Sequence, residues 1–180
     1  MFEEAAPVAA TRRPLTAPAC WAVTAASVLM LWFHLFTEQG WVPFVDSANL
    51  ALHEAGHPLI GMFSNRLMVY GGTIFQLLFP WLVIRHFLKA DDALGVAAGR
   101  VWFGENLLNV ARYMADARAQ LLPLVGGGEH DWTEIFTRWG VLTADTRIAG
   151  LTRLLGIGLI LWAVYRLWLA YKNPDDLERL

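Results

Sequence analysis

The sequence has a single cysteine, Cys20, so no disulfide can form within the chain, and cysteine usage leaves the redox compartment open. Charged residues are also scarce: Asp, Glu, Lys and Arg make up 17% of the 180 residues, against about a quarter in average soluble domains. The net charge is −2 and no basic tract occurs, which argues against a nucleic-acid partner. The glycines at 126–128 lack the Lys-Ser/Thr ending of a phosphate-binding loop.

Hydrophobic residues, by contrast, make up 56% of the chain and form stretches of membrane length. Residues 19–37 carry no charged side chain and are long enough to cross about 30 Å of hydrocarbon as a helix. A second long run covers residues 148–171, and its Arg153 and Arg166 lie toward the two ends, where they can reach the interface. We expect an integral membrane protein whose first run is a retained anchor rather than a cleaved signal peptide.

The remaining hydrophobic periodicity predicts three further helices, at residues 68–87, about 93–118 and about 47–64. A short amphipathic helix outside the membrane is expected within residues 132–147. The expected fold class is therefore all-α, a polytopic membrane helix bundle with four to five hydrophobic segments.

We expect one transmembrane helical domain over residues 19–172, with a mobile N-terminal tail at 1–18 and a C-terminal tail at 173–180. Basic residues precede the first run and are missing from the loop after it, which favours a cytoplasmic N-terminus in an inner or plasma membrane. Five crossings would leave the C-terminus outside. If the helix at 47–64 is re-entrant or interfacial, four crossings bring both ends inside.

The stretch NLALHEAGHPLIG, residues 49–61, places His53, Glu54 and His57 within an apolar run. On a helix, histidines four residues apart stand one turn apart on the same face, so both imidazoles can bind one metal ion. Glu54 can reach a water held by that metal and act as a general base. This is the H-E-x-x-H pattern of two zinc ligands and a base. A histidine pair packed between helices is the structural alternative, but ionisable groups in membrane helices are usually functional, which favours a Zn²⁺ site.

A catalytic zinc needs a third protein ligand and an open position. Polar side chains recur on one face of the fourth helix, which must face the bundle interior or a cavity rather than lipid. They are Asn106, Asn109, Tyr113, Asp116 and Gln120. Asp116 and His130 are the two candidates for the third ligand, and Asn106 and Asn109 could orient substrate or bound water. The core of the metal site would then span about residues 47–132.

Both candidate ligands also have a structural interpretation. Asp116 could form a salt bridge with Arg112 or Arg118 instead. His130 could belong to a helix start that Asp131 caps. The polar face of the fourth helix favours Asp116 as the third ligand, while His130 is the better zinc ligand by residue type.

Other polar and small residues carry weaker expectations. A lone histidine such as His34 is expected to be hydrogen-bonded to a neighbour rather than to bind metal. Gln76, in the third hydrophobic helix, is expected to pair either with the polar face or with backbone. Gly56 predicts that another chain segment approaches its helix closely, and the pair Gly71-Gly72 predicts either a break or a close backbone approach.

The HEAGH motif within a hydrophobic helix resembles the membrane-embedded zinc metallopeptidases of the site-2 protease type. In that family a glycine-containing segment follows the motif, and VYGGTIFQLLFP at 69–80 is similar to it. A later helix carries an Asn…Asp-Gly motif whose aspartate is the third zinc ligand, and NVARYMAD at 109–116 resembles a diverged form of it. The resemblance covers about residues 47–120 and implies that Asp116 is the third ligand.

Three positions depart from the family pattern. Ala117 stands where the family has glycine, the prolines of that motif are missing, and Pro58 follows the second histidine directly. Because the chain is short, we expect no regulatory domain beside the membrane segments.

Together these features predict an integral membrane zinc metallopeptidase-like protein that hydrolyses peptide bonds in or near the bilayer. Its partners would be the lipid bilayer and a membrane-associated or transmembrane protein substrate, and assembly into a homo-oligomer stays open. The alternative is a non-catalytic metal-binding or assembly protein with the same fold. Transport of a metal or small polar solute along the polar face is a third hypothesis, disfavoured by the small number of helices.

Overall fold

The computed structural model describes residues 14–125 and 129–173, and over these ranges all of the regular secondary structure is helical. The helices are α1 (Ala17–Phe36), α2 (Val45–Gly61), α3 (Met68–Lys89), α4 (Ala93–Ala115), α5 (Asp131–Arg138), the short 3-10 helix η2 (Leu142–Ala144) and α6 (Asp145–Lys172). The all-α prediction is confirmed for this part of the chain. Most of the two predicted tails, and the glycines at 126–128, lie outside the described residues.

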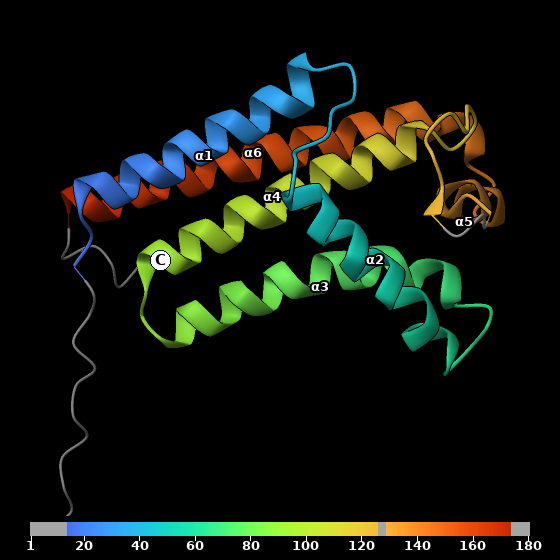
Figure 1. Ribbon diagram of the computed structural model, residues 1–180, viewed down its shortest axis with the longest axis horizontal. Helices are drawn as coiled ribbons and strands as arrows, with labels where there is room; N and C mark the ends of the chain where they lie inside the picture. The colour runs from blue at the N-terminus through green and yellow to red at the C-terminus, as the bar shows by residue number, and fades with distance from the viewer. Residues whose placement is uncertain (1–13, 126–128, 174–180) are drawn as a thin grey trace, which may run out of the picture.

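The long helices α1, α4 and α6 lie side by side, and α3 runs along the other side of α4 (Figure 1). The shorter α2 lies obliquely against α3, and α5 sits at the end of the bundle where α4 ends and α6 begins. The start of α1 and the end of α6 lie together at the opposite end. The centre of the bundle is therefore α4, which packs between α3 and α6.

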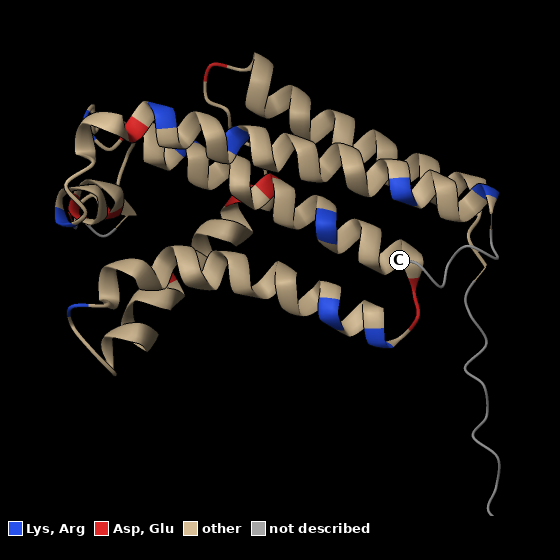
Figure 2. Ribbon diagram, turned by 180° about the vertical axis from the view of Figure 1, so that it is seen from behind, with Lys and Arg blue, Asp and Glu red and all other residues tan. Residues whose placement is uncertain are grey.

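Three helical segments are long and apolar enough to cross a membrane: α1, α3 and the continuous stretch Leu142–Lys172 that contains α6. Most of the residues in their apolar stretches are not buried against other helices, and large side chains such as Trp32, Phe36 and Leu155 are exposed. Charged residues are sparse along these helices (Figure 2). Extended apolar outer surfaces of this kind are consistent with a membrane protein.

The predicted number of four to five hydrophobic segments is larger than the structure supports. α2 has only 17 residues and carries Asp46, Glu54 and the two histidines of the motif. α4 has 23 residues but contains Arg100, Glu105 and Arg112, which lowers its hydropathy. Because α4 is the central helix, neighbouring helices bury polar side chains such as Glu105 and Asn106.

Candidate functional site

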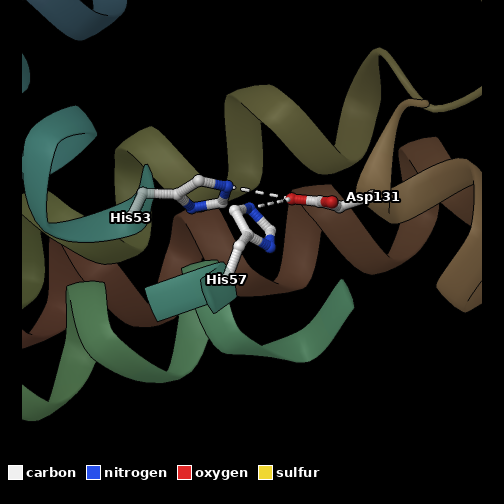
Figure 3. Close-up of side chains that lie close together, drawn as sticks. All are labelled: His53, His57 and Asp131. Carbon is white, nitrogen blue, oxygen red and sulfur yellow. Dashed lines mark hydrogen bonds and ion pairs between the residues drawn. The ribbon is translucent and has the colours of Figure 1, made fainter. Parts of the chain in front are cut away.

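Two histidines of α2 and one aspartate of α5 converge where α5 approaches α3 and α4 (Figure 3). His53 Nε2 lies 2.9 Å, and His57 Nε2 3.3 Å, from the same oxygen, Oδ2 of Asp131. His53 and Asp131 are buried and His57 is half-buried. We refer to these three residues as the His–His–Asp cluster. The helical spacing predicted the meeting of the two imidazoles, whereas Asp131 was not among the predicted ligands.

The second ring nitrogen of each histidine faces an oxygen that can only accept. His53 Nδ1 lies 3.2 Å from Gln76 Oε1, and His57 Nδ1 lies 3.0 Å from the backbone carbonyl of Met68. Both Nδ1 atoms therefore carry a proton and donate it. In neutral imidazoles this directs both Nε2 lone pairs at the Asp131 carboxylate. Such an arrangement is repulsive unless a metal ion lies between them or an Nε2 carries a proton, and the hydrogen bond with Asp131 does raise the pKa of His57. Metal-binding histidines typically donate their other N–H in this way.

The donors fit a zinc ion in type and in spacing. Zinc binds imidazole nitrogen and carboxylate oxygen at about 2.0–2.2 Å in tetrahedral sites, which separates neighbouring ligand atoms by about 3.3 Å. The nitrogen–oxygen distances of 2.9 and 3.3 Å in the His–His–Asp cluster are of this size. Ligand atoms of all three residues lie within 4.8 Å of one another. These side chains could hold a metal ion and leave a fourth position open.

A chain of amides connects His53 to a buried carboxylate. Gln76 Nε2 donates to Asn109 Oδ1 at 2.8 Å, and Asn109 Nδ2 donates to Asp46 Oδ1 at 2.7 Å. The other oxygen of Asp46 accepts the backbone N–H of Val42 at 2.6 Å. Because Asp46 Oδ1 accepts from the Asn109 amide nitrogen, the oxygens of Asn109 and then of Gln76 are directed toward His53. We call this chain the amide relay; it holds the imidazole in the tautomer that presents Nε2 to the cluster.

Glycines bring α3 against the histidine face of α2. A Cβ atom on Gly72 would overlap the His53 imidazole, and one on Gly56 would overlap the backbone carbonyl of Gly71. The predicted close approach of these segments is therefore confirmed. It brings Gln76, one turn after Gly72, within hydrogen-bonding distance of His53.

Asp131 is the first residue of α5, and its surroundings keep its carboxylate ionised. Its backbone N–H donates to the Tyr113 hydroxyl at 3.2 Å, which ties the start of α5 to α4. Burial alone would raise the pKa of the Asp131 carboxyl, but the hydrogen bonds with His53 and His57 outweigh it and hold that pKa below its usual value. An ionised carboxylate is the form that binds a metal.

Asp116, the third ligand predicted from the polar face, does not reach the histidines. α4 ends at Ala115, and Asp116 forms its C-terminal cap. The two carboxylate oxygens of Asp116 accept backbone N–H groups from Leu121 at 2.9 Å and Leu122 at 3.0 Å. Because the helix stops before this residue, its side chain turns toward the following loop. It stabilises the segment that leads to Asp131.

His130, the other predicted ligand, caps α5. Its Nδ1 accepts the backbone N–H of Thr133 at 3.3 Å, and its ring packs on Tyr113 with centroids 4.2 Å apart. Its Nε2 lies 3.4 Å from Asp116 Oδ2. Burial lowers the pKa of His130, although Asp116 opposes the shift. His130 thus marks the helix start, as the structural interpretation expected, but it is itself the cap in place of Asp131.

A cleft of about 560 Å³ opens beside the His–His–Asp cluster. His53 and Glu54 line it from α2, and Asn109, Arg112 and Tyr113 line it from α4. The other lining residues are Gln39, Gln76 and six apolar ones: Trp41, Leu50, Leu122, Pro123, Leu124 and Val125. The volume is within the range of sites that bind small ligands. The predicted base therefore shares a cleft with one of the predicted ligands.

The two predicted asparagines differ in position. Asn109 lines the cleft, but both ends of its amide are engaged in the amide relay. Asn106 is fully buried, and its Nδ2 donates to the backbone carbonyl of Trp102 at 2.9 Å. Asn109 therefore acts on His53 rather than on a molecule in the cleft.

A second group of His and acidic residues, the acid-pair cluster, consists of His34, Asp46 and Glu105. His34 Nε2 lies 3.2 Å from Glu105 Oε1, and Asn49 Nδ2 donates to Glu105 Oε2 at 2.8 Å. Their ligand atoms are also close enough to hold a metal ion. However, both oxygens of Asp46 and both of Glu105 already have hydrogen-bonding partners. None of the three residues lines the cleft.

No protein-family model, curated protein or solved structure matches the chain. The interpretation of the cleft therefore depends on the geometry of its own residues. That geometry consists of three convergent ligand atoms and an adjacent cleft that His53 and Glu54 line.

Proposed function

We propose that the protein is an integral membrane zinc metallopeptidase that hydrolyses peptide bonds in or near the bilayer. The observation that carries this proposal is the convergence of two Nδ1-protonated imidazoles on one oxygen of Asp131, next to a cleft that Glu54 lines. Three apolar helices support the membrane location.

In this proposal His53, His57 and Asp131 hold the zinc, and Asp131 takes the role that the sequence suggested for Asp116. Zinc, when bound there, would supply a Lewis acid that activates water and polarises a carbonyl group. Glu54 follows His53 in the chain and lines the same cleft. Its carboxylate takes a proton from the attacking water and returns it to the leaving amine.

Tyr113 is suited to stabilise the negative charge that develops on the carbonyl oxygen. Its hydroxyl accepts the N–H of Asp131, and within the described residues its own O–H has no acceptor. Because Tyr113 also lines the cleft, that proton is available to the substrate oxygen. A preorganised donor of this kind contributes most where water is excluded.

The proposal is tested by metal content and peptidase activity of the full chain in detergent. Wild type should bind one zinc and cleave a transmembrane reporter, whereas His53→Ala should lose both properties. Glu54→Gln should retain zinc and lose cleavage by roughly 100-fold to 10,000-fold, the range typical of a general base. Glu38→Gln, which changes an exposed glutamate, is the matched control.

Two results would contradict the mechanism in different ways. Unchanged cleavage by zinc-loaded Glu54→Gln would remove Glu54 as the base. Stoichiometric zinc without any cleavage by wild type would favour the non-catalytic metal-binding alternative.

A further inference from the structure

One cationic side chain in the cleft has no hydrogen bond or ion pair with any described residue. Arg112 of α4 lines the cleft together with His53 and Glu54, and it is half-buried. Its guanidinium carbon lies 5.7 Å from the centroid of the Trp41 ring, at cation–π distance. A half-buried charge that lacks a counter-ion is costly, which makes such a group a binding site for an anion.

The nearby carboxylates form no ion pair with Arg112. The charges of Asp46 and Asp116 reach it, but neither forms an ion pair with it. Both oxygens of Asp46 accept hydrogen bonds in the amide relay and from backbone, and both oxygens of Asp116 accept backbone N–H groups. Arg118 shows the contrast, because its guanidinium pairs with Asp145 at 2.8 Å. Arg112 is therefore available to an anion that enters the cleft.

The loop before α2 holds the Arg112 side chain in place. Trp41 provides an aromatic face for the guanidinium, and Gly40, whose φ is 53°, lets the loop pass beside the arginine stem. A guanidinium is planar and presents a fork of N–H donors that matches a carboxylate with two parallel hydrogen bonds. A side chain held in this way loses less entropy when it binds such a group.

The remainder of the cleft wall is mostly apolar. Leu50 of α2 and the segment of residues 122–125, LPLV, line the cleft together with the polar residues of α4. Apolar walls with a few placed polar groups are typical of sites that orient one class of small ligand. The complementary ligand is apolar and carries one anionic group.

We propose that Arg112 binds a carboxylate of the peptide substrate, so that the cleft selects peptides in which an apolar residue adjoins a carboxylate. The carboxylate is either the free C-terminus or an acidic side chain, both of which offer the same two oxygens. The assignment of this carboxylate to a substrate rests on the proposed peptidase function. The binding it describes needs neither zinc nor turnover.

Binding is measured by calorimetry on the metal-free full chain in detergent, which removes zinc as an alternative carboxylate ligand. Three probes are compared: N-acetyl-leucyl-leucine, its C-terminal amide, and N-acetyl-glutamyl-leucine amide. At least one carboxylate probe should bind 10-fold to 100-fold more tightly than the neutral amide, the effect of charge-assisted hydrogen bonds. The carboxylate probe that binds more tightly shows whether the site prefers a C-terminal carboxylate or an acidic side chain.

Arg112→Gln should abolish this preference, and Arg85→Gln should preserve it. Arg85 is a matched control because its guanidinium also lies 5.7 Å from a tryptophan ring, that of Trp81, but outside the cleft lining. Arg112→Lys should retain the charge and only part of the preference, since an ammonium lacks the planar fork. Thermal unfolding of each variant checks that the fold is retained.

Equal binding of acid and amide probes by wild type overturns the inference, as does an undiminished preference in Arg112→Gln. Arg112-dependent binding of phosphatidylglycerol vesicles without any peptide preference overturns it in favour of a lipid site. The two proposals also fail separately. Carboxylate binding without cleavage counts against the peptidase alone, and cleavage that is indifferent to Arg112→Gln counts against the carboxylate site alone.

Discussion

The His–His–Asp cluster and the acid-pair cluster contain the same kinds of residue but differ in which atoms are free. In the first, both Nε2 atoms converge on one carboxylate oxygen, and the cleft lies alongside. In the second, each carboxylate oxygen already has a hydrogen-bonding partner, and no member lines the cleft. Asp46 belongs to the second cluster and reaches the first through the amide relay. Residue type alone therefore does not distinguish residues that can bind a metal from residues that hold those ligands in position.

This difference suggests that the acid-pair cluster serves the other one. Its buried carboxylate at Asp46 accepts from Asn109, and that amide holds Gln76 toward His53. Outer partners of this kind fix the tautomer of a metal-binding imidazole. Substitutions can distinguish a direct ligand, a packing contact, a residue that orients a ligand and a residue that is only buried.

The largest effect is expected from the aspartate that completes the His–His–Asp cluster. Asp131→Ala should weaken zinc binding by more than the roughly 10-fold to 100-fold that outer partners contribute, because a direct ligand is lost. Asp116→Ala is the paired variant, and it should keep one zinc per chain while losing about 1 kcal/mol of stability from its loop hydrogen bonds. Zinc titration and thermal unfolding measure the two effects. Loss of zinc in the Asp116 variant alone would restore the assignment made from sequence.

A methyl group at Gly72 should disturb the same cluster through packing. In Gly72→Ala the new Cβ meets the His53 imidazole, so the ring must move or α3 must shift, at a cost of about 1–3 kcal/mol. We expect a lower unfolding temperature together with weaker zinc binding. Gly150→Ala is the control, since a Cβ there meets nothing within 4 Å. Equal behaviour of the two variants would contradict the close contact of α2 and α3.

Two asparagines on α4 separate the amide relay from simple burial. Asn109→Ala breaks the relay and should weaken zinc binding by about 10-fold to 100-fold while the stoichiometry stays at one per chain. Asn106→Ala removes a buried amide outside the relay, so it should lower stability without changing zinc affinity. If both variants bind zinc as tightly as wild type, the relay does not position His53.

The smallest effect on metal binding is expected in the acid-pair cluster itself. Glu105→Gln keeps the shape of a fully buried side chain but replaces an acceptor by a donor, which should cost about 1–3 kcal/mol of stability. Metal analysis should still find one zinc per chain. A stoichiometry of two in wild type that falls to one in this variant would make the acid-pair cluster a metal site as well.

Much of the fold was predictable because membrane helices and helix faces leave local signals. The apolar runs predicted α1, α3 and α6 to within a few residues, and the four-residue spacing predicted that His53 and His57 share a face. Gly56 predicted that another segment approaches its helix closely, and the structure identifies that segment as α3. The number of hydrophobic segments was overestimated, because periodicity marks α4 as a helix without revealing that it is the enclosed one.

Asp131 could not be identified in this way. It lies 74 residues beyond His57 (131 − 57) on a separate short helix, and its position after His130 is equally typical of a helix start. The favoured Asp116 followed the helical period of α4, but the helix ends at Ala115. The Asp116 carboxylate would face the bundle interior only if α4 continued beyond Ala115.

The sequence by itself determined the helical class, the apolar segments and the histidine pair, since each follows from residues that are neighbours along one helix. Only the tertiary structure decided which carboxylate meets the imidazoles, which amides orient them and which arginine shares their cleft. These relations join segments far apart in the chain, and they depend on where α4 stops and how closely α2 and α3 pack. Local propensity carries no information about such distances.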